Sequence, residues 1–377
     1  METLHSVLKH GAMYSDWDAF PQSLFVERLA ATRRAIRDAG DDAWIVYGDA
    51  QNYGEFAYLT HFLPRLRSSL VLITPDGAPI LLTCVGSRDI PAMQVLTWIT
   101  DIRPYWRLPE EMAQILADAG LTNARIGLVG VRDSMPIGDW DAIRRNVAGV
   151  HWTFRDAEFG EVRTPDAATA RAIRHAASVV DAGLRAATTF FRERPTFRAA
   201  SAEVERVVRR LAAEDVRILV GGAPQSGYQL RPPDDAPILA EHAVPIVLAC
   251  EVQRCWAEGA ITIPGNAHRP QERMLAETAE RVLSAMVATV APKTRAASVW
   301  DAAMRSLDDP SLRACAATYG MGHGIGLDAN EEPEILADGA GSFASCAGVA
   351  LHVVLQHDRD SAAAGTTLVR SGERFTR

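Results

Sequence analysis

The sequence predicts an α/β domain followed by an α+β domain. The chain has 377 residues, and globular domains average about 150 residues. Strand-like and helix-like segments alternate through roughly the first 160 residues, which is typical of a mixed sheet covered by helices. Beyond a helix start at Thr164-Pro165-Asp166, long helices and long apolar strands come in separate runs. We therefore expect a boundary near residues 157–164 and domains 1–160 and 161–377.

Local patterns predict the elements of the first domain. Apolar side chains at helical spacing that stop before glycine predict helices, and short apolar runs predict strands. Pro75-Asp76-Gly77 between two apolar runs predicts a hairpin turn. The expected elements are a helix Phe25–Ala39, a strand Ala43–Tyr47, hairpin strands Ser69–Thr74 and Pro79–Thr83, a helix Glu110–Ala119, a strand Ala124–Val129, a helix Gly138–Asn146 and a strand His151–Phe154.

The second domain is expected to begin with one long amphipathic helix. Thr164 is a suitable cap, Pro165 suits the first helical position, and Asp166 favours the positive end of the helix dipole. Apolar residues then recur at three- and four-residue steps from Ile173 to Ala187. The further expected elements are a helix Ala199–Ala213, a strand Val216–Val220, an extended stretch Ala243–Ile263 that reverses near Gln253-Arg254, helices Gln271–Val290 and Ala297–Ser306, and short closing strands.

Composition argues against several classes of protein. The chain has 47 acidic and 39 basic residues and no Lys/Arg tract, so we expect no nucleic-acid partner and no membrane partner. No apolar run approaches the roughly 20 residues of a membrane helix, and the N-terminus lacks the features of a signal peptide. The 5 cysteines are scattered and form no CxxC pair, which favours a reduced cytoplasmic protein over a disulfide framework or zinc site.

The most informative stretch lies near the C-terminus. Gly320–Pro333 reads GMGHGIGLDANEEP, with His323 between two glycines. Glycine lets the backbone approach the imidazole closely and hold the ring in a tight site. The stretch resembles the GHGIG and EEP signature of the pita-bread family, which includes methionine aminopeptidase, proline aminopeptidase, prolidase and creatinase. The alternative interpretation is a Gly-rich turn with a structural histidine.

Three other segments agree with this resemblance. Tyr58-Leu59-Thr60 resembles a segment of the creatinase N-terminal domain, and Trp256-Ala257-Glu258 resembles the peptidase strand that carries a metal ligand. The closing segment Gly365–Thr376 resembles the final strand of the family. The resemblance covers nearly the whole chain and implies a creatinase-type N-terminal α/β domain followed by a C-terminal pita-bread domain. It also implies a homodimer, because creatinase-type N-terminal domains pack against the partner's catalytic domain.

The resemblance further implies which residues occupy the family's metal positions. The peptidases bind two metals through two aspartates, one histidine and two glutamates. Here His323 keeps the histidine, and Glu258 stands at the second aspartate position. The remaining positions hold Val247, Val354 and either Ala363 or Ala364. Glu251, the nearest spare carboxylate, lies four residues along the strand from Val247, or roughly 13 Å. We therefore expect no metal and no other cofactor, and a more apolar pocket that suits an aromatic or alkyl-bearing substrate.

Chemistry without a metal has a precedent in the resemblance, because creatinase breaks a C–N bond with a histidine and glutamates. We predict a small-molecule enzyme in which His323, Glu258 and His352 perform acid–base catalysis on a C–N-containing metabolite. The reaction would be hydrolysis or a related elimination, cyclisation or isomerisation. Creatinase activity itself is not expected, because its substrate histidine is replaced near Tyr228 or Gln229. The residues expected to bind substrate are Tyr228, Gln229, Arg254, Trp256, Asn330 and Glu332.

Two other functions stay open. The first is a metalloaminopeptidase of the Xaa-Pro type with an atypical ligand set built on Glu258, His323 and His352. The second is a catalytically inactive pita-bread module that binds a partner, as in histone chaperones. Each candidate also has a purely structural interpretation: Glu258 as an exposed hairpin end, and His352 as a histidine satisfied within the core.

Overall fold

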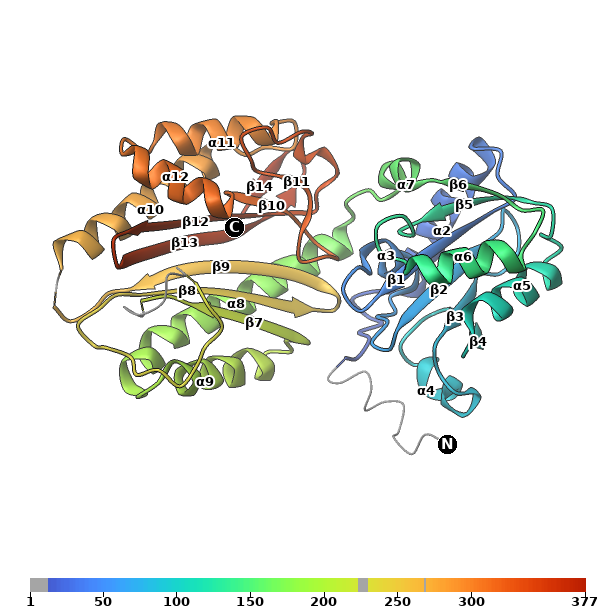
Figure 1. Ribbon diagram of the computed structural model, residues 1–377, viewed down its shortest axis with the longest axis horizontal. Helices are drawn as coiled ribbons and strands as arrows, with labels where there is room; N and C mark the ends of the chain where they lie inside the picture. The colour runs from blue at the N-terminus through green and yellow to red at the C-terminus, as the bar shows by residue number, and fades with distance from the viewer. Residues whose placement is uncertain (1–12, 223–229, 268) are drawn as a thin grey trace. The chain divides into compact units, whose positions relative to one another are not determined.

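The computed structural model describes residues 13–222, 230–267 and 269–377. The chain forms two compact units, Met1–Thr164 and Pro165–Arg377, which we call unit 1 and unit 2. Figure 1 shows the helices and strands of both. Within the described ranges, no helix combines the length and the apolarity that crossing a bilayer requires.

Unit 1 is built on a six-stranded mixed sheet with the strand order β4-β3-β2-β1-β5-β6. The strands are β1 (Ala43–Asp49), β2 (Ser68–Ile73), β3 (Ile80–Thr83), β4 (Asp101–Pro104), β5 (Arg125–Val129) and β6 (His151–Phe154). Strand β2 runs antiparallel to β1 and β3, and the other pairings are parallel. The carboxyl ends of β1, β3, β4, β5 and β6 therefore lie at one edge of the sheet, as expected for a mixed α/β domain.

The helices of unit 1 divide into predicted and unpredicted ones. Three of them, α2 (Gln22–Asp38), α5 (Leu108–Asp118) and α6 (Ile137–Asn146), lie within a few residues of their predicted positions. The short helices α3 (Gly54–Thr60), α4 (Ile90–Met93) and α7 (Asp156–Val162) were not predicted. Helix α7 is anchored by contacts that a local pattern does not show, because the Arg155 guanidinium donates to the Asp41 carboxylate at 2.7 and 3.0 Å.

Unit 2 contains an eight-stranded antiparallel sheet with the order β11-β10-β12-β13-β9-β8-β7, and β14 pairs with β13. Its strands are β7 (Asp215–Val220), β8 (Val244–Val252), β9 (Cys255–Ile263), β10 (Gly322–Ile325), β11 (Glu331–Glu334), β12 (Gly348–His357), β13 (Asp360–Ser371) and β14 (Arg374–Thr376). Its helices are α8 (Ala167–Glu193), α9 (Phe197–Arg210), α10 (Pro270–Thr289), α11 (Ala296–Arg305) and α12 (Pro310–Tyr319).

The helices of unit 2 pack against alternate side chains of the sheet. Helix α8 contacts β8 and β9, and α10 contacts β12 and β13 (Figure 1). Val353 of β12 and Ala257 of β9 lie in the helix-covered cores. Because successive side chains of a strand point to opposite faces, His352, Val354 and Glu258 lie on the other face of the sheet. That face carries the candidate site.

Two details at element ends were tested by the structure. The long helix α8 was predicted, but its cap is Asp166 and not Thr164, because the Asp166 carboxylate accepts a hydrogen bond from the Thr169 N–H at 2.8 Å. The predicted reversal between β8 and β9 is confirmed, since Gln253 and Arg254 have φ of 52° and 64°. Left-handed backbone at two consecutive residues is the geometry of a tight hairpin turn.

Candidate active site

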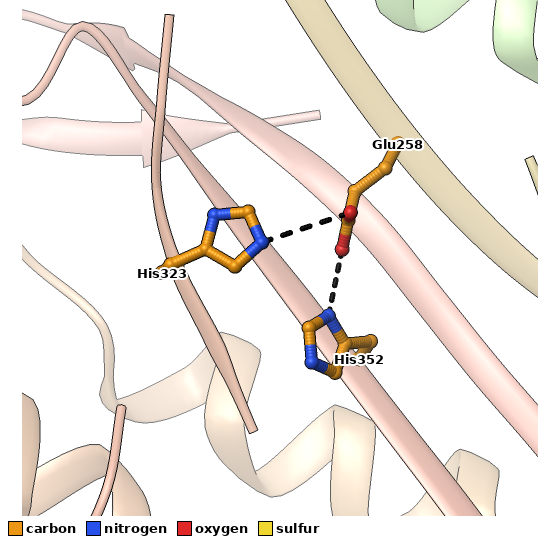
Figure 2. A group of neighbouring side chains, drawn as sticks. All are labelled: Glu258, His323 and His352. Carbon is orange, nitrogen blue, oxygen red and sulfur yellow. Dashed lines mark hydrogen bonds and ion pairs between the residues drawn. The ribbon is translucent and has the colours of Figure 1, made fainter. Parts of the chain in front are cut away.

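Three titratable side chains from three strands meet on the face of the unit 2 sheet opposite the helix-covered cores. They are Glu258 of β9, His323 of β10 and His352 of β12 (Figure 2). Glu258 Oε1 lies 2.7 Å from His352 Nδ1, and Glu258 Oε2 lies 3.7 Å from His323 Nε2. The two imidazole rings meet edge-on with their centroids 5.7 Å apart. We call Glu258, His323 and His352 the triad.

Hydrogen-bond partners assign a different role to each ring. A carboxylate only accepts, so His352 Nδ1–H donates to Glu258, and Nδ1 is the ring atom that contacts the carboxylate. His323 Nδ1 lies 2.8 Å from the Gly324 carbonyl oxygen, which also only accepts, so Nδ1–H donates there. His323 Nε2 then faces the carboxylate. A lone pair at that atom would repel Glu258, so the geometry favours a protonated His323.

Burial and charge shift the pKa values of Glu258 and His323. The triad side chains are only 13–19% exposed. Burial alone would raise the pKa of Glu258, but the two neighbouring histidines outweigh it and hold the pKa well below its usual range. Burial alone would lower the pKa of His323, but Glu258 and the Gly324 carbonyl outweigh it and the pKa is raised. The triad therefore stabilises a carboxylate beside an imidazolium.

The glycines around His323 are required by close backbone packing. A Cβ at Gly322, where φ is +130°, would lie 2.1 Å from the Ala350 carbonyl oxygen of β12. A Cβ at Gly324 would lie 2.7 Å from the Glu332 carbonyl oxygen of β11. Strand β10 is thus held between its neighbours at a separation that only glycine permits, and this fixes the position of the His323 ring.

The family's other metal positions come together as an apolar cluster beside the triad. Register pairs Val247 with Ala260 and Val354 with Ala363. These four side chains and Leu230 form one cluster, which we call the valine–alanine cluster. The sequence could not decide whether Ala363 or Ala364 occupies the last of the family's metal-ligand positions. Ala364 lies in the helix-covered core on the opposite face, so Ala363 is the residue on the site face.

A two-metal centre does not fit this donor set. Two adjacent divalent cations need bridging carboxylates, and the valine–alanine cluster offers only methyl groups where the family has them. A single metal is closer to the geometry, since ligand atoms of Glu258, His323 and His352 all lie within 4.8 Å of one another. Glu251 does not belong to that group.

The described residues also bring His242, Glu272 and Asp360 together. Arg269 already occupies this group, because its guanidinium contacts His242 Nδ1 at 2.5 Å and Asp360 Oδ1 at 3.3 Å. Glu272 accepts hydrogen bonds from the Ala243 N–H at 2.9 Å and lies 3.2 Å from His242. A resident positive charge makes this an ion-pair network rather than a cation site.

Arg254 is a correction to the predicted substrate residues. Its side chain is fully buried, and its guanidinium pairs with Glu214 at 3.3 Å. The Arg254 N–H also donates to Glu214 at 3.2 Å, which closes the β8–β9 turn. The sequence placed Arg254 on the strand face of Glu258, but it lies in the turn, where strand alternation no longer applies. It is therefore not available to a substrate.

The other predicted binding residues lie at different depths. Trp256 is 1% exposed and packs with Ile325 and Ala350 beside the triad, so it forms a wall rather than a polar contact. Asn330 donates to Glu334 at 3.1 Å, and Glu332 accepts from the Glu334 N–H at 3.2 Å, and both bonds are exposed at strand β11. Tyr228 and Gln229 lie outside the described residues.

Two residues near the triad were not predicted. Thr367 of β13 accepts a hydrogen bond from the Glu258 N–H at 2.8 Å and donates to the Glu258 carbonyl at 2.8 Å, which fixes the backbone under the carboxylate. The Arg217 guanidinium of β7 lies 4.4 Å from the centre of the Trp256 ring. Strand alternation on β13 was the signal that could have placed Thr367 on the site face.

Comparisons with known proteins agree with the fold. Residues 171–358 match the model of metallopeptidase family M24. A search of curated proteins found no match. The prolidase from Pyrococcus horikoshii OT3 is a similar solved structure, with TM-score 0.79 and 15% identity over 93% of this chain and 97% of that chain.

Two further structures are similar over most of their length. The dipeptidase PepE from Mycobacterium ulcerans has TM-score 0.77 and 19% identity over 94% of this chain and 95% of that chain. The N-terminal domain of the FACT complex subunit SPT16 from Cicer arietinum has TM-score 0.65 and 13% identity over 94% and 95%. With His323 and its glycines in place and the M24 model matched, the chain belongs to the pita-bread, creatinase-like family of the M24 peptidases.

Proposed function

We propose that this chain is a metal-independent enzyme that acts on a small C–N-containing metabolite. The observation that carries the proposal is the triad, in which one carboxylate faces two imidazoles that have different hydrogen-bond partners. An acid and a base held within reach of one atom are what general acid–base catalysis needs. The M24 scaffold supports a hydrolase at the coarse level.

The geometry suggests a division of labour. Glu258 orients His352 through Nδ1–H, and in this proposal Nε2 of the neutral His352 ring is the general base that removes a proton from water or substrate. His323 Nε2–H is the general acid that protonates the leaving nitrogen. In hydrolysis, water gives a proton to His352 while its oxygen bonds to the carbon, the C–N bond breaks, and the leaving nitrogen takes the proton from His323. The proton on His352 then passes through solvent to His323, which restores the starting state. The same pair supports elimination or cyclisation when the base removes a substrate proton instead.

The valine–alanine cluster supports metal independence and a substrate with an apolar part. It places methyl groups beside the triad at the positions where two bridged cations would need carboxylates. Trp256, Ile325 and Ala350 form a second apolar wall. An alkyl or aromatic group of the substrate would be held between these walls, with its C–N bond at the triad.

The test combines metal content with turnover. Elemental analysis of purified protein should find substoichiometric Mn, Co, Fe and Zn. A panel of amides, amidines and N-alkyl amino acids should yield an activity that EDTA does not reduce. Glu258→Gln and His352→Asn should each lower kcat by at least about 100-fold, while the control Glu277→Gln, an exposed carboxylate of α10 that pairs with Arg273, should retain it. Stoichiometric metal with chelator-sensitive turnover would contradict the proposal.

Two alternatives have their own supporting observations. The close approach of three ligand atoms favours a mononuclear metalloaminopeptidase, and metal-dependent cleavage of Xaa-Pro dipeptides would establish it. The likeness to the SPT16 domain favours a partner-binding module without catalysis. A chain in which His323→Ala and Glu258→Ala leave the cellular phenotype intact would favour that module.

A further inference from the structure

Unit 1 contains a cavity of about 540 Å³ that the triad does not use. The cavity lies at the carboxyl ends of β1 and β4 and beside the first turns of α5 and α6. It is lined by Tyr47, Asp49, Arg67, Ser68, Tyr105 and Trp106, and by residues of the two helix starts. Small-molecule sites have volumes of about 300–1,000 Å³ and favour this edge of parallel strands.

The floor of the cavity is a chain of hydroxyl groups. Tyr105 Oη donates to the Ser68 carbonyl at 2.8 Å, so the Ser68 hydroxyl, 2.8 Å away, donates to Tyr105. Tyr47 is also hydrogen-bonded to Ser68, and burial raises the pKa of both tyrosines to about 12. Both phenols therefore stay neutral, and their O–H groups are directed to Ser68 and not toward the cavity. The hydroxyl oxygens at the floor of the cavity can therefore accept hydrogen bonds from a ligand.

The charged lining disfavours an anion. Helix starts attract anions, but Glu110 of α5 and Asp139 of α6 already place carboxylates in these first turns. The partly buried Asp139 carboxylate has no hydrogen bond or ion pair within the described part of the chain, and Asp49 lies with it near the Tyr47 hydroxyl. Both arginines are turned to other partners: Arg107 is 3.9 Å from Glu110, and Arg67 donates to the Trp106 carbonyl at 3.5 Å.

We propose that this cavity binds a small organic cation with N–H donors, of the ammonium or guanidinium class. Asp139 would pair with the cation, and the Tyr47 oxygen would accept one of its N–H groups. Asp49, whose Oδ1 accepts from the Gln51 and Asn52 N–H groups at 2.8 and 2.9 Å, would add its negative charge to the site. Trp106, which is 54% exposed at the cavity, offers a ring face for cation–π contact. A polyol satisfies the acceptors but not the charge. The lining has three carboxylates and two guanidiniums, a net negative charge that disfavours an anion.

The test is isothermal titration of the full-length chain with agmatine, which carries both cationic groups. We expect saturable binding that weakens at least tenfold in Asp139→Asn. Asp133→Asn, an exposed carboxylate in the same connection but outside the cavity lining, is the matched control and should bind as the unmodified chain does. Glu258→Gln should also bind normally, which separates this site from the triad and from the fate of the proposed function.

Other outcomes overturn the proposal. Binding of inorganic phosphate or glucose in preference to agmatine contradicts the assigned ligand class. An unchanged affinity in both Asp139→Asn and Tyr47→Phe, with circular dichroism confirming folded variants, places any binding elsewhere. Absence of saturable binding up to 10 mM agmatine rejects an ammonium or guanidinium site.

Discussion

Glu258 is the residue on which the proposed chemistry depends, because its two oxygens face two different rings. Its position on β9 is secured at the backbone by Thr367, which bonds both its N–H and its carbonyl. The carboxylate therefore cannot move toward one histidine without losing the other. The fixed backbone allows the Glu258 carboxylate to hold His323, the proposed acid, and His352, the proposed base, on its two oxygens.

The first prediction concerns the protonation of His323. In Glu258→Gln the negative charge that raises the pKa of His323 is gone, while the burial that lowers it remains, so the pKa should fall to or below about 6.5. An NMR pH titration of the histidine ring signals would measure the shift. The exposed Glu332→Gln should leave the His323 titration unchanged. A His323 titration that is the same in Glu258→Gln would mean that the charge coupling is absent.

The second prediction follows from linkage. The raised pKa of His323 stabilises the fold below about pH 6.5 and is lost as the pH rises through the folded-state value. The lowered pKa of Glu258 stabilises the fold above about pH 4.3 and is lost as the pH falls through its folded value. The destabilisation caused by Glu258→Gln should therefore be largest between about pH 4.3 and 6.5. Urea unfolding of both chains across this range would measure it, and a pH-independent difference would rule out this linkage.

At the scale of elements, the β8–β9 hairpin shows where sequence reasoning stops. A reversal near Gln253-Arg254 was predicted within the strand-like stretch Ala243–Ile263 and is confirmed by the left-handed backbone there. The buried partner of Arg254 was not predicted, because Glu214 lies 40 residues earlier in the chain. A turn is a local property, whereas an ion pair of this kind depends on which elements the fold brings together.

The third prediction is that this pair is energetically important. Glu214→Ala removes the Glu214 carboxylate from the buried Arg254 guanidinium, which should cost roughly 3–5 kcal/mol of unfolding free energy. The control is Glu205→Ala, which removes an exposed partner of Arg209 and should cost about 0–1 kcal/mol. Denaturant unfolding monitored by fluorescence provides both values. Equal costs for the two variants would show that burial does not matter here.

The fourth prediction concerns the start of α8. Asp166→Ala removes the acceptor of the Thr169 N–H and should destabilise unit 2 by about 1 kcal/mol. Asp181→Ala, an exposed change within the same helix, is the control and should be close to neutral. Thermal unfolding of the two variants distinguishes them. If Thr164→Ala rather than Asp166→Ala lowers the Tm, the cap assignment is wrong.

For the whole molecule, the fold could be predicted to a large extent, because alternating segments and the glycine-bracketed His323 are both visible along the chain. Of the candidate site, the three triad residues were predicted from motif position and strand alternation, and the structure brings them together. The contact of Thr367 with Glu258 was not predicted, because the two residues are 109 positions apart in the sequence. Helix α12 was also not predicted, although Asp309-Pro310 is a recognisable start in which Asp309 accepts from the Ser311 N–H at 2.7 Å.

The fifth prediction is the assembly state. We propose a homodimer on the resemblance to creatinase-type proteins, whose N-terminal domain packs against the partner's catalytic domain. Light scattering after size exclusion should give twice the chain mass of 40.9 kDa. A monomeric mass at micromolar concentration would remove the proposal. The triad lies within unit 2 alone, so its geometry does not depend on the outcome.

The valine–alanine cluster also determines which substitutions could give this chain a two-metal site. Val247, Val354 and Ala363 sit on β8, β12 and β13 but touch one another. Restoring any one carboxylate alone would place an unpaired charge among methyl groups, a loss of several kcal/mol with no cation yet held to offset it. Only simultaneous replacement at all three positions would rebuild a two-metal set. Each single substitution toward a two-metal site would therefore lower the unfolding free energy of the chain before any metal could bind.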